Sequence, residues 1–226
     1  MNLDNFEHLA EASGGILYLM ALLLLVALTV VIERSWYLRK VIKQGNQVLH
    51  QLESVVRVDS ETLSHLGENF PQMPHAKVVA VAMKHDLTHD FDRIMDKLEE
   101  SIMREAPGID RYLWILDTIV TLAPLLGLLG TIIGMFNTFQ VLADPGNAPS
   151  KVTGGVAEAL LATASGLFIA ILGLFFFNAL NNRVRVILHQ LETLKMMLVN
   201  RMYMHYQDPL QKTSGGNVSE LRARAV

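Results

Sequence analysis

The sequence contains no cysteine, and the familiar catalytic motifs are missing as well. Without cysteine there are no disulfides, no thiolate catalysis and no cysteine-based metal site. A nucleotide-binding loop, a nucleophile elbow and a zinc motif are also absent from the sequence. The net charge of −3 is too small to indicate a partner by itself. We therefore expect a protein that is not an enzyme, that holds no metal or cofactor, and that does not bind nucleic acid.

Charged residues are missing from three long stretches, residues 12–32, 118–143 and 159–182. The first contains 21 uncharged residues and the second contains 26. A hydrocarbon core of ~30 Å is crossed by about 20 apolar residues in a helix, so each stretch is long enough to span it. Acidic rather than basic residues precede the first stretch, which favours a retained helix over a signal peptide. The sequence predicts an all-α membrane protein with three transmembrane helices.

Basic residues are nearly absent from one side of these stretches. The segment before the first stretch has no lysine or arginine, and the loop between the second and third has only Lys151. Lysine and arginine collect on the cytoplasmic side of membrane proteins. The pattern predicts a periplasmic N-terminus and a cytoplasmic C-terminus. The basic residues assigned to the cytoplasmic side are Arg34, Arg39, Lys40, Lys43, Arg104, Arg111, Arg183, Arg185 and Lys195.

Outside the membrane, apolar residues recur at helical spacing and predict long cytoplasmic helices that extend the spans. Near-heptad spacing is found at Val184, Ile187, Leu191, Leu194 and Leu198. These helices pack either on each other or on copies of the chain, and the two are compatible. The predicted division is a periplasmic segment 1–13, transmembrane helix 14–33, cytoplasmic helical domain 34–112, transmembrane helix 113–142, periplasmic hairpin 143–152, transmembrane helix 153–181, cytoplasmic helix 182–206 and disordered tail 207–226.

Glu158 is the only titratable residue between Val152 and Asn182. A carboxylate at membrane depth is costly, so it is expected to face protein or water rather than lipid. One interpretation is a structural hydrogen bond to a neighbouring helix. The other is a proton relay or gate, helped by a pKa that desolvation raises. Glu158 is therefore the first candidate for a functional site.

Two threonines are predicted to lie at one level in the membrane. Thr131 precedes the hairpin by about 11 residues and Thr163 follows it by about 11, so at ~1.5 Å per residue both lie roughly 16 Å below the outer boundary. Glu158 would lie roughly 8–9 Å below the same boundary. Each threonine either bonds a carbonyl one turn back in its own helix or belongs to a polar seam that conducts a proton or cation. Thr121, Pro124, Leu128, Thr131, Met135 and Thr138 are predicted to form one stripe.

Small residues in the second and third spans predict close helix packing. Gly130 and Gly134 form a small-xxx-small pair, with Gly127 one turn before and Gly166 in the third span. Pro124 removes one helix hydrogen bond and leaves a carbonyl free in the membrane. Two weaker candidates lie elsewhere. His85 and His89 have the spacing of metal ligands but favour a solvated helix face, and Asp117 is most simply an interfacial charge.

The two small-residue segments, Ala123–Met135 and Gly155–Leu167, resemble the paired signatures of the MotA/TolQ/ExbB family. The resemblance implies the stator of a proton-driven motor, in which Thr131 and Thr163 correspond to pore-lining threonines and Glu158 to the intramembrane glutamate. It also implies a homo-pentamer in the bacterial (Gram-negative) inner membrane, around the transmembrane helices of an ExbD or TolR partner that carries an essential aspartate.

Within the family the chain resembles the ExbB branch first and the TolQ branch second. The ExbB branch implies that the proton motive force energises TonB-dependent outer-membrane import of siderophores, iron or vitamin B12. The TolQ branch implies the Tol-Pal envelope system, with TolA in place of TonB. The competing interpretation is a non-conducting scaffold, whose polar residues serve packing alone.

Overall fold

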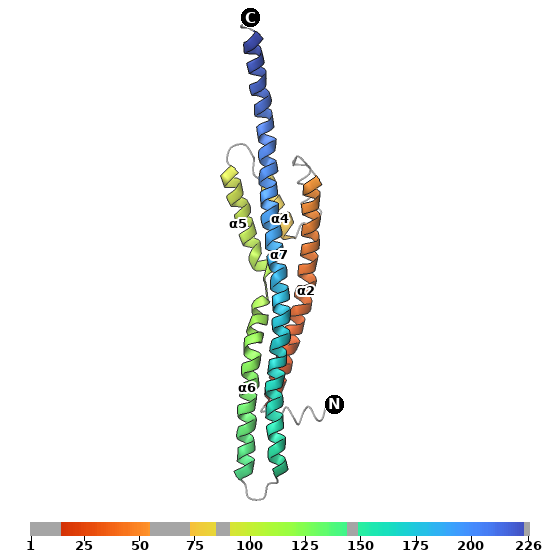
Figure 1. Ribbon diagram of the computed structural model, residues 1–226, viewed down its shortest axis with the longest axis vertical. Helices are drawn as coiled ribbons and strands as arrows, with labels where there is room; N and C mark the ends of the chain where they lie inside the picture. Colours follow the sequence, from red (N-terminus) through yellow and green to blue (C-terminus); the bar gives the residue numbers. More distant parts are fainter. Residues whose placement is uncertain (1–14, 55–72, 85–90, 144–148, 224–226) are drawn as a thin grey trace. The chain divides into compact units, whose positions relative to one another are not determined.

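The fold consists of five long helices within residues 15–54, 73–84, 91–143 and 149–223, which are the residues described by this computed structural model. Side chains are described over 15–54, 73–83, 92–140 and 153–201. No strand occurs in these ranges, and three helices are long and apolar enough to cross a membrane. The predicted all-α membrane fold is therefore confirmed. In chain order the helices are α2 (Ile16–Ser54), α4 (Pro74–Lys84), α5 (Phe91–Ile109), α6 (Leu113–Ala143) and α7 (Pro149–Ala223) (Figure 1).

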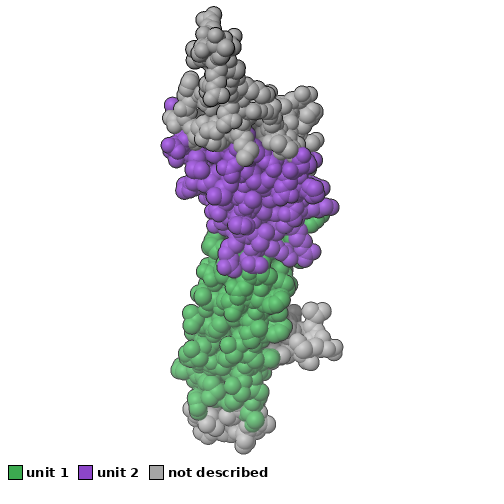
Figure 2. Space-filling view, turned by 45° about the horizontal axis from the view of Figure 1, so that its top comes forward, with its two compact units in different colours: residues 1–36, 111–181 green, residues 37–110, 182–226 purple. Residues whose placement is uncertain are grey.

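The chain forms two compact units, shown in separate colours in Figure 2. The first comprises residues 1–36 and 111–181, and the second comprises residues 37–110 and 182–226. Helices α2 and α7 each contribute one part to the first unit and another to the second. The first unit contains the three charge-poor stretches, and the second contains the helices with alternating apolar and charged faces.

In the first unit, small residues form the helix contacts and large apolar residues point outward. Ala123 of α6 and Ala162 of α7 are fully buried. Side chains such as Leu125, Ile132 and Phe168 are 59–60% exposed. This is the reverse of a water-soluble core, in which the largest apolar side chains are buried. It is the arrangement of helices that pack through small residues and present their bulk to lipid or to other membrane helices.

The second unit has an ordinary aqueous core. The predicted near-heptad residues of α7 are all buried, as are apolar residues of α2, α4 and α5 in the same unit. Burying each such side chain contributes about 1.5–3 kcal/mol. On α5, Ile94, Leu98 and Ile102 are buried, whereas Met95 is 39% exposed. The buried set is Leu38, Val41, Val48, Leu52, Ala76, Val78, Val79, Ala82, Ile94, Leu98, Ile102, Val184, Ile187, Leu191, Leu194 and Leu198.

The junction between α5 and α6 is fixed by a buried arginine. Tyr112 has a φ of 67°, a left-handed conformation that ends one helix before the next begins. The Arg34 guanidinium is only 3% exposed, donates to the Arg111 carbonyl and lies 5.5 Å from the centre of the Tyr112 ring. Glu33 supplies a carboxylate 3.7 Å away. Arg34 therefore holds the short segment where α6 starts.

The sequence-based boundaries after residues 33, 181 and 206 are not marked by breaks in the helices. Helix α2 continues past residue 33, and α7 continues past 181 and 206 to Ala223. A helix therefore stands where the sequence predicts a tail without structure, but side chains beyond 201 lie outside the described residues. The periplasmic and cytoplasmic assignments and the disordered tail stay predictions.

Candidate functional site

Thr131 and Thr163 lie side by side where α6 and α7 pack against each other. Their hydroxyl oxygens are 3.4 Å apart, although 32 residues separate them in the chain. Both side chains are partly buried. Counting residues from the hairpin therefore predicted that these two threonines lie close together within the first unit.

The two hydroxyls differ in what they donate to. Thr131 donates to the carbonyl of Leu128 at 2.7 Å, three residues back in its own helix. Thr163 donates across the interface to the carbonyl of Gly127 on α6 at 2.9 Å. The simpler interpretation, a bond within the same helix, thus holds for Thr131 and fails for Thr163. Thr163 ties the two helices together and leaves its oxygen able to accept a further hydrogen bond.

Glycines bring the two backbones close enough for this bond. A methyl group at Gly127 would lie 3.0 Å from the Thr163 Cα, and one at Gly134 would lie 2.9 Å from the Ala159 Cβ. A methyl group at Gly166 would collide with the Ala123 carbonyl oxygen. These contacts explain why small residues are needed at these positions. A larger residue at any of them would push Thr163 away from Gly127.

Pro124 lies inside α6 without ending it, because the helix runs unbroken from Leu113 to Ala143. Proline has no N–H, so the carbonyl four residues back, that of Val120, loses its usual helical donor. The hydroxyl of Thr121 donates instead to the carbonyls of Thr118 and Asp117, at 2.9 and 3.2 Å. Pro124 therefore removes the usual helical donor of the Val120 carbonyl, about two turns before Gly127.

The predicted stripe along α6 does not face a single environment. Thr121 is exposed, Thr131 is partly buried and Thr138 is buried with its hydroxyl on the carbonyl of Gly134 at 2.8 Å. A spacing of alternating three and four residues falls short of 3.6 per turn, so the stripe drifts by about 100° over 17 residues. The interpretation as one polar stripe is wrong. Only its middle, at Thr131, meets Thr163.

Glu158 lies on α7 five residues before Thr163 and is partly exposed. Within the described residues its carboxylate has neither a hydrogen-bond donor nor an ion-pair partner. The adjacent Ala159 is buried against Gly134, so Glu158 lies at the edge of the helix contact rather than inside it. A carboxylate in this position is available to a group from outside the chain.

The N-terminal end of α2 gives a second measure of depth. A methyl group at Gly130 would lie 3.6 Å from Cγ2 of Ile16, so the first turn of α2 lies level with the threonine pair. From Ile16 to Arg34 the helix rises about 27 Å, close to the ~30 Å of a hydrocarbon core. Beyond Gly130, α6 continues for about 20 Å to Ala143. Helices α6 and α7 therefore extend past the start of α2, and Glu158 lies in the part of α7 that extends.

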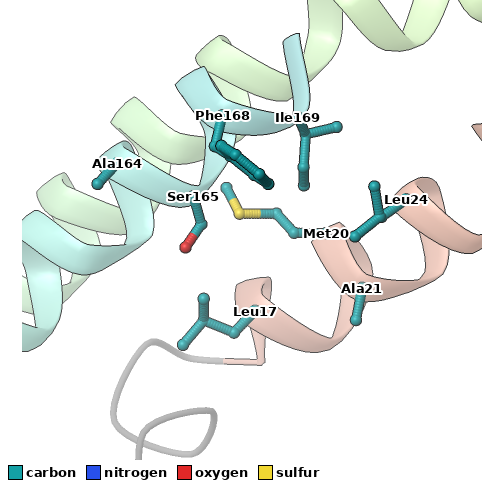
Figure 3. Close-up of a pocket in the computed structure, with 8 residues that line it drawn as sticks. All are labelled: Leu17, Met20, Ala21, Leu24, Ala164, Ser165, Phe168 and Ile169. Atoms are coloured by element: carbon teal, nitrogen blue, oxygen red, sulfur yellow. The ribbon is translucent and has the colours of Figure 1, made fainter. Parts of the chain in front are cut away.

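An apolar groove separates α2 from α7 in the same unit (Figure 3). Its volume is about 470 Å³, and Met20 of α2 reaches toward Phe168 and Ile169 of α7. Ser165 supplies the only side-chain hydroxyl in its lining. The groove has no charged lining residue, so it differs from the region around Glu158 and suits apolar material only.

The predicted histidine pair, His85 and His89, lies outside the described residues. Among the residues that are described, no cluster of three potential metal ligands occurs. Asp117 is exposed near the start of α6, in keeping with an interfacial charge. The described part of the chain thus offers one titratable group, Glu158, close to the threonine pair.

Sequence reasoning missed two groups that the structure buries. Arg34 was assigned only to the cytoplasmic charge count, yet it is a buried residue of α2 that donates to the Arg111 carbonyl just before α6. His75 was not singled out, yet it is 1% exposed beside Gly45 and Gln190. A usable signal was present: Gly45 falls at helical spacing between Val41 and Val48, where a large residue would be expected.

Comparison with known proteins matches residues 71–193 to the model of the MotA/TolQ/ExbB proton channel family. This range includes α4, α5, α6 and the part of α7 that carries Glu158 and Thr163. The match therefore covers more than half of the 226 residues and all of the candidate site.

Individual relatives carry both branch names. A biopolymer transport protein of Synechocystis sp. named ExbB-like 3 is 32% identical over 161 residues, covering 68% of this chain and 74% of that protein. TolQ of Haemophilus influenzae is 35% identical over 94 residues, 41% of each chain. ExbB of Xanthomonas campestris is 38% identical over 82 residues, 36% of this chain and 32% of that protein. With three apolar helices and these relatives, this is a multi-pass membrane protein, and it belongs to the MotA/TolQ/ExbB proton channel family.

Proposed function

We propose that this chain is the ring-forming subunit of a proton-driven motor, with Thr131, Thr163 and Glu158 on the proton pathway. The single observation that supports the proposal best is the partnerless, partly exposed Glu158 carboxylate five residues from a threonine pair that joins two helices. Threonine does not change its protonation at working pH, so the hydroxyls can only orient water or an incoming carboxylic acid. Glu158 is the group that takes up or passes on charge.

The pathway needs a second chain. A proton cannot cross the membrane on Glu158 alone, because the described side chains of α6 beyond Asp117 and of α7 before Arg183 include no other titratable group. We infer a small partner of the ExbD or TolR type, whose single transmembrane helix carries an aspartate past Thr131 and Thr163. Glu158 acts as a relay or gate that feeds this aspartate. One charge crossing 100 mV releases about 2.3 kcal/mol, which is available to move the partner helix.

We assign the partner helix to the centre of a homo-pentamer in a bacterial inner membrane, with the N-terminus periplasmic and the C-terminus cytoplasmic. The asymmetric distribution of lysine and arginine supports this orientation. The first candidate for the downstream system is the TonB type, which energises outer-membrane import. The Tol-Pal system, with TolA, is the second candidate, because a TolQ protein is 35% identical to this chain over 94 residues.

The test is partner-dependent energy coupling in cells that carry the chain and its partner. Glu158→Gln keeps the shape of the side chain but cannot lose a proton, so coupling should be abolished. Thr163→Val should reduce coupling strongly because it removes the bond to Gly127. Asp117→Asn, an exposed carboxylate near the end of the same helix hairpin, is the matched control and should retain full coupling.

Pulldown of the partner separates conduction from scaffolding. If Glu158→Gln binds the partner normally but does not couple, the proton pathway is supported. If the variant loses the partner and coupling together, Glu158 is a packing residue of a scaffold. Full coupling in both Glu158→Gln and Thr163→Val would refute the proposed pathway. Inspection of neighbouring genes for a one-span protein with a membrane aspartate, followed by a TonB or TolA gene, distinguishes the two branches.

A further inference from the structure

A second partnerless polar group lies in the other unit, where helices α2, α4 and α7 meet. His75, the second residue of α4, is 1% exposed, and neither ring nitrogen has a hydrogen-bond partner. The side-chain oxygen of Gln190 on α7 is buried and unpaired as well. Buried polar groups are normally hydrogen-bonded, so a group of this kind requires an explanation.

The imidazole is pressed against the backbone of α2. A methyl group at Gly45 would lie 2.5 Å from the His75 Nε2 and 2.6 Å from the Gln190 Oε1. Gly45 therefore leaves room for the ring, and any other residue there would displace it. Gln190 is itself fixed, because its amide donates to the Asn46 Oδ1 at 2.7 Å. Three segments that are distant in sequence thus close around one imidazole.

This enclosure suits only the neutral ring. A protonated imidazole carries two N–H donors and a charge, whereas neither ring nitrogen of His75 has a hydrogen-bond acceptor in this enclosure. Its position in the first turn of α4 adds a further penalty, since the N-terminal end of a helix repels positive charge. Burial accordingly lowers the pKa of His75 from 6.5 to about 4, although the neighbouring Gln190 raises it in part.

No charged side chain compensates for this. Nearby titratable residues of the surrounding helices are exposed or, in the case of Glu105, partly buried, and Lys77 is engaged with Glu105 of α5 at 2.8 Å. None of them shifts the pKa of His75, because the shift arises from burial and from the neighbouring Gln190. These residues are Lys43 and His50 on α2, Lys77 on α4, Glu105 on α5, and His189 and Glu192 on α7.

We propose that His75 is an acid-sensitive latch, which holds the start of α4 against α2 and α7 while neutral and releases it on taking up a proton. Helix α4 is suited to release. It has only 11 residues and is anchored by the small apolar side chains Ala76, Val78, Val79 and Ala82. Acidification of the aqueous side on which this unit lies would therefore loosen α4 before the rest of the unit.

The sign and size of the effect follow from linkage. The ring has a lower pKa when α4 is docked than when α4 is released, so docking is fully stable above pH 6.5. Stability is lost as the pH falls from 6.5 towards 4. Between pH 7.5 and pH 5.5 the docking equilibrium constant should fall about tenfold.

The test is hydrogen–deuterium exchange of the full-length, membrane-embedded protein at both pH values, after correction for intrinsic exchange rates. Peptides covering residues 74–84 should lose about tenfold of their protection at pH 5.5. This loss should disappear in His75→Leu and in His75→Gln, neither of which titrates. The matched control His189→Gln removes an exposed histidine of α7 and should keep the wild-type response.

Two results would overturn the latch. One is equal protection of residues 74–84 at both pH values in the wild type. The other is a pH response that persists in either His75 variant. Should neither variant fold, slow exchange at the imidazole Cε1 hydrogen in the wild type decides, because residues 74–84 contain one histidine. A midpoint near 4 supports the latch, and a midpoint near 6.5 refutes it.

Discussion

Within the described residues each unit contains a polar group that lacks a hydrogen-bond partner, Glu158 in the first and His75 in the second, but the reason differs between them. In the first unit Glu158 is partly exposed at the edge of a helix contact, where a group from another chain can reach it. In the second unit His75 is enclosed by Gly45 and Gln190 of its own chain. An accessible unpaired group indicates a missing partner, whereas an enclosed one indicates a preference for the neutral state. The lack of a hydrogen-bond partner therefore supports a different function in each unit.

The largest effect should come from filling the contact that holds the first unit together. Gly166→Leu places a side chain against the Ala123 carbonyl, which belongs to backbone and cannot move aside. We expect α6 and α7 to separate, with loss of the folded protein from the membrane, because overpacking alone costs about 1–3 kcal/mol or more. The yield and the melting temperature of the variant in detergent measure this loss of folded protein.

Gly154→Leu is the control for this substitution, since nothing lies within 4 Å of a methyl group at that position. It should be tolerated in the isolated protein. Equal loss of yield in Gly154→Leu and Gly166→Leu would show that helix contact within the chain is not the cause.

The next largest effect concerns the second unit. Gly45→Ala introduces a methyl group 2.5 Å from the His75 ring and should expel it from its site, at a cost of about 1–3 kcal/mol. Exchange protection of residues 74–84 at pH 7.5 reports this loss. Gly108→Ala, where a methyl group meets nothing within 4 Å, should leave the protection unchanged. Wild-type protection in Gly45→Ala would show that the ring is not held there.

A smaller effect is expected at the threonine pair. Thr163→Val removes the hydrogen bond to Gly127 and should destabilise the first unit by about 1 kcal/mol. Thr163→Ser keeps the hydroxyl and should restore most of the stability. Thr118, whose hydroxyl bonds the Trp114 carbonyl in its own helix, provides the comparison. If Thr118→Val and Thr163→Val have the same effect, the bond between helices has no special role.

The smallest effect should come from the surface of the second unit. Lys195 and Glu99 form an ion pair of 2.7 Å, but Glu99 is 48% exposed. Water and salt screen such pairs, so a double-mutant cycle should give a coupling of no more than about 1 kcal/mol. A larger coupling in the unfolding free energy would mean that α5 is held on α7 by charge rather than by buried residues such as Leu98 and Leu194.

Much of the first unit could be predicted because its determinants are local in sequence. The three spans follow from missing charge, and the meeting of Thr131 with Thr163 follows from counting equal distances along two antiparallel helices. The prediction of one stripe through Thr121 and Thr138 failed because the small difference between the residue spacing and the helical repeat accumulates along α6. The position of α2 could not be predicted either, because no pattern in its own residues indicates that Ile16 lies beside Gly130 of α6.

The second unit was harder to predict where polar residues are involved. Its apolar residues obey helical spacing, so α7 was identified correctly from Val184 to Leu198. His75 follows no such rule, because its burial depends on a glycine and a glutamine from helices 30 and 115 residues away. The partner proposed for Glu158 could not be found in this sequence, because the proposal places it on another chain.

The most direct test of the central claim is proton flux through the purified complex of this chain and its one-span partner in liposomes. A membrane potential is imposed and a pH-sensitive dye is enclosed. The account predicts flux in the wild type and in Asp117→Asn, and loss of at least tenfold in Glu158→Gln with the complex still assembled. Wild-type flux in an assembled Glu158→Gln complex would contradict it.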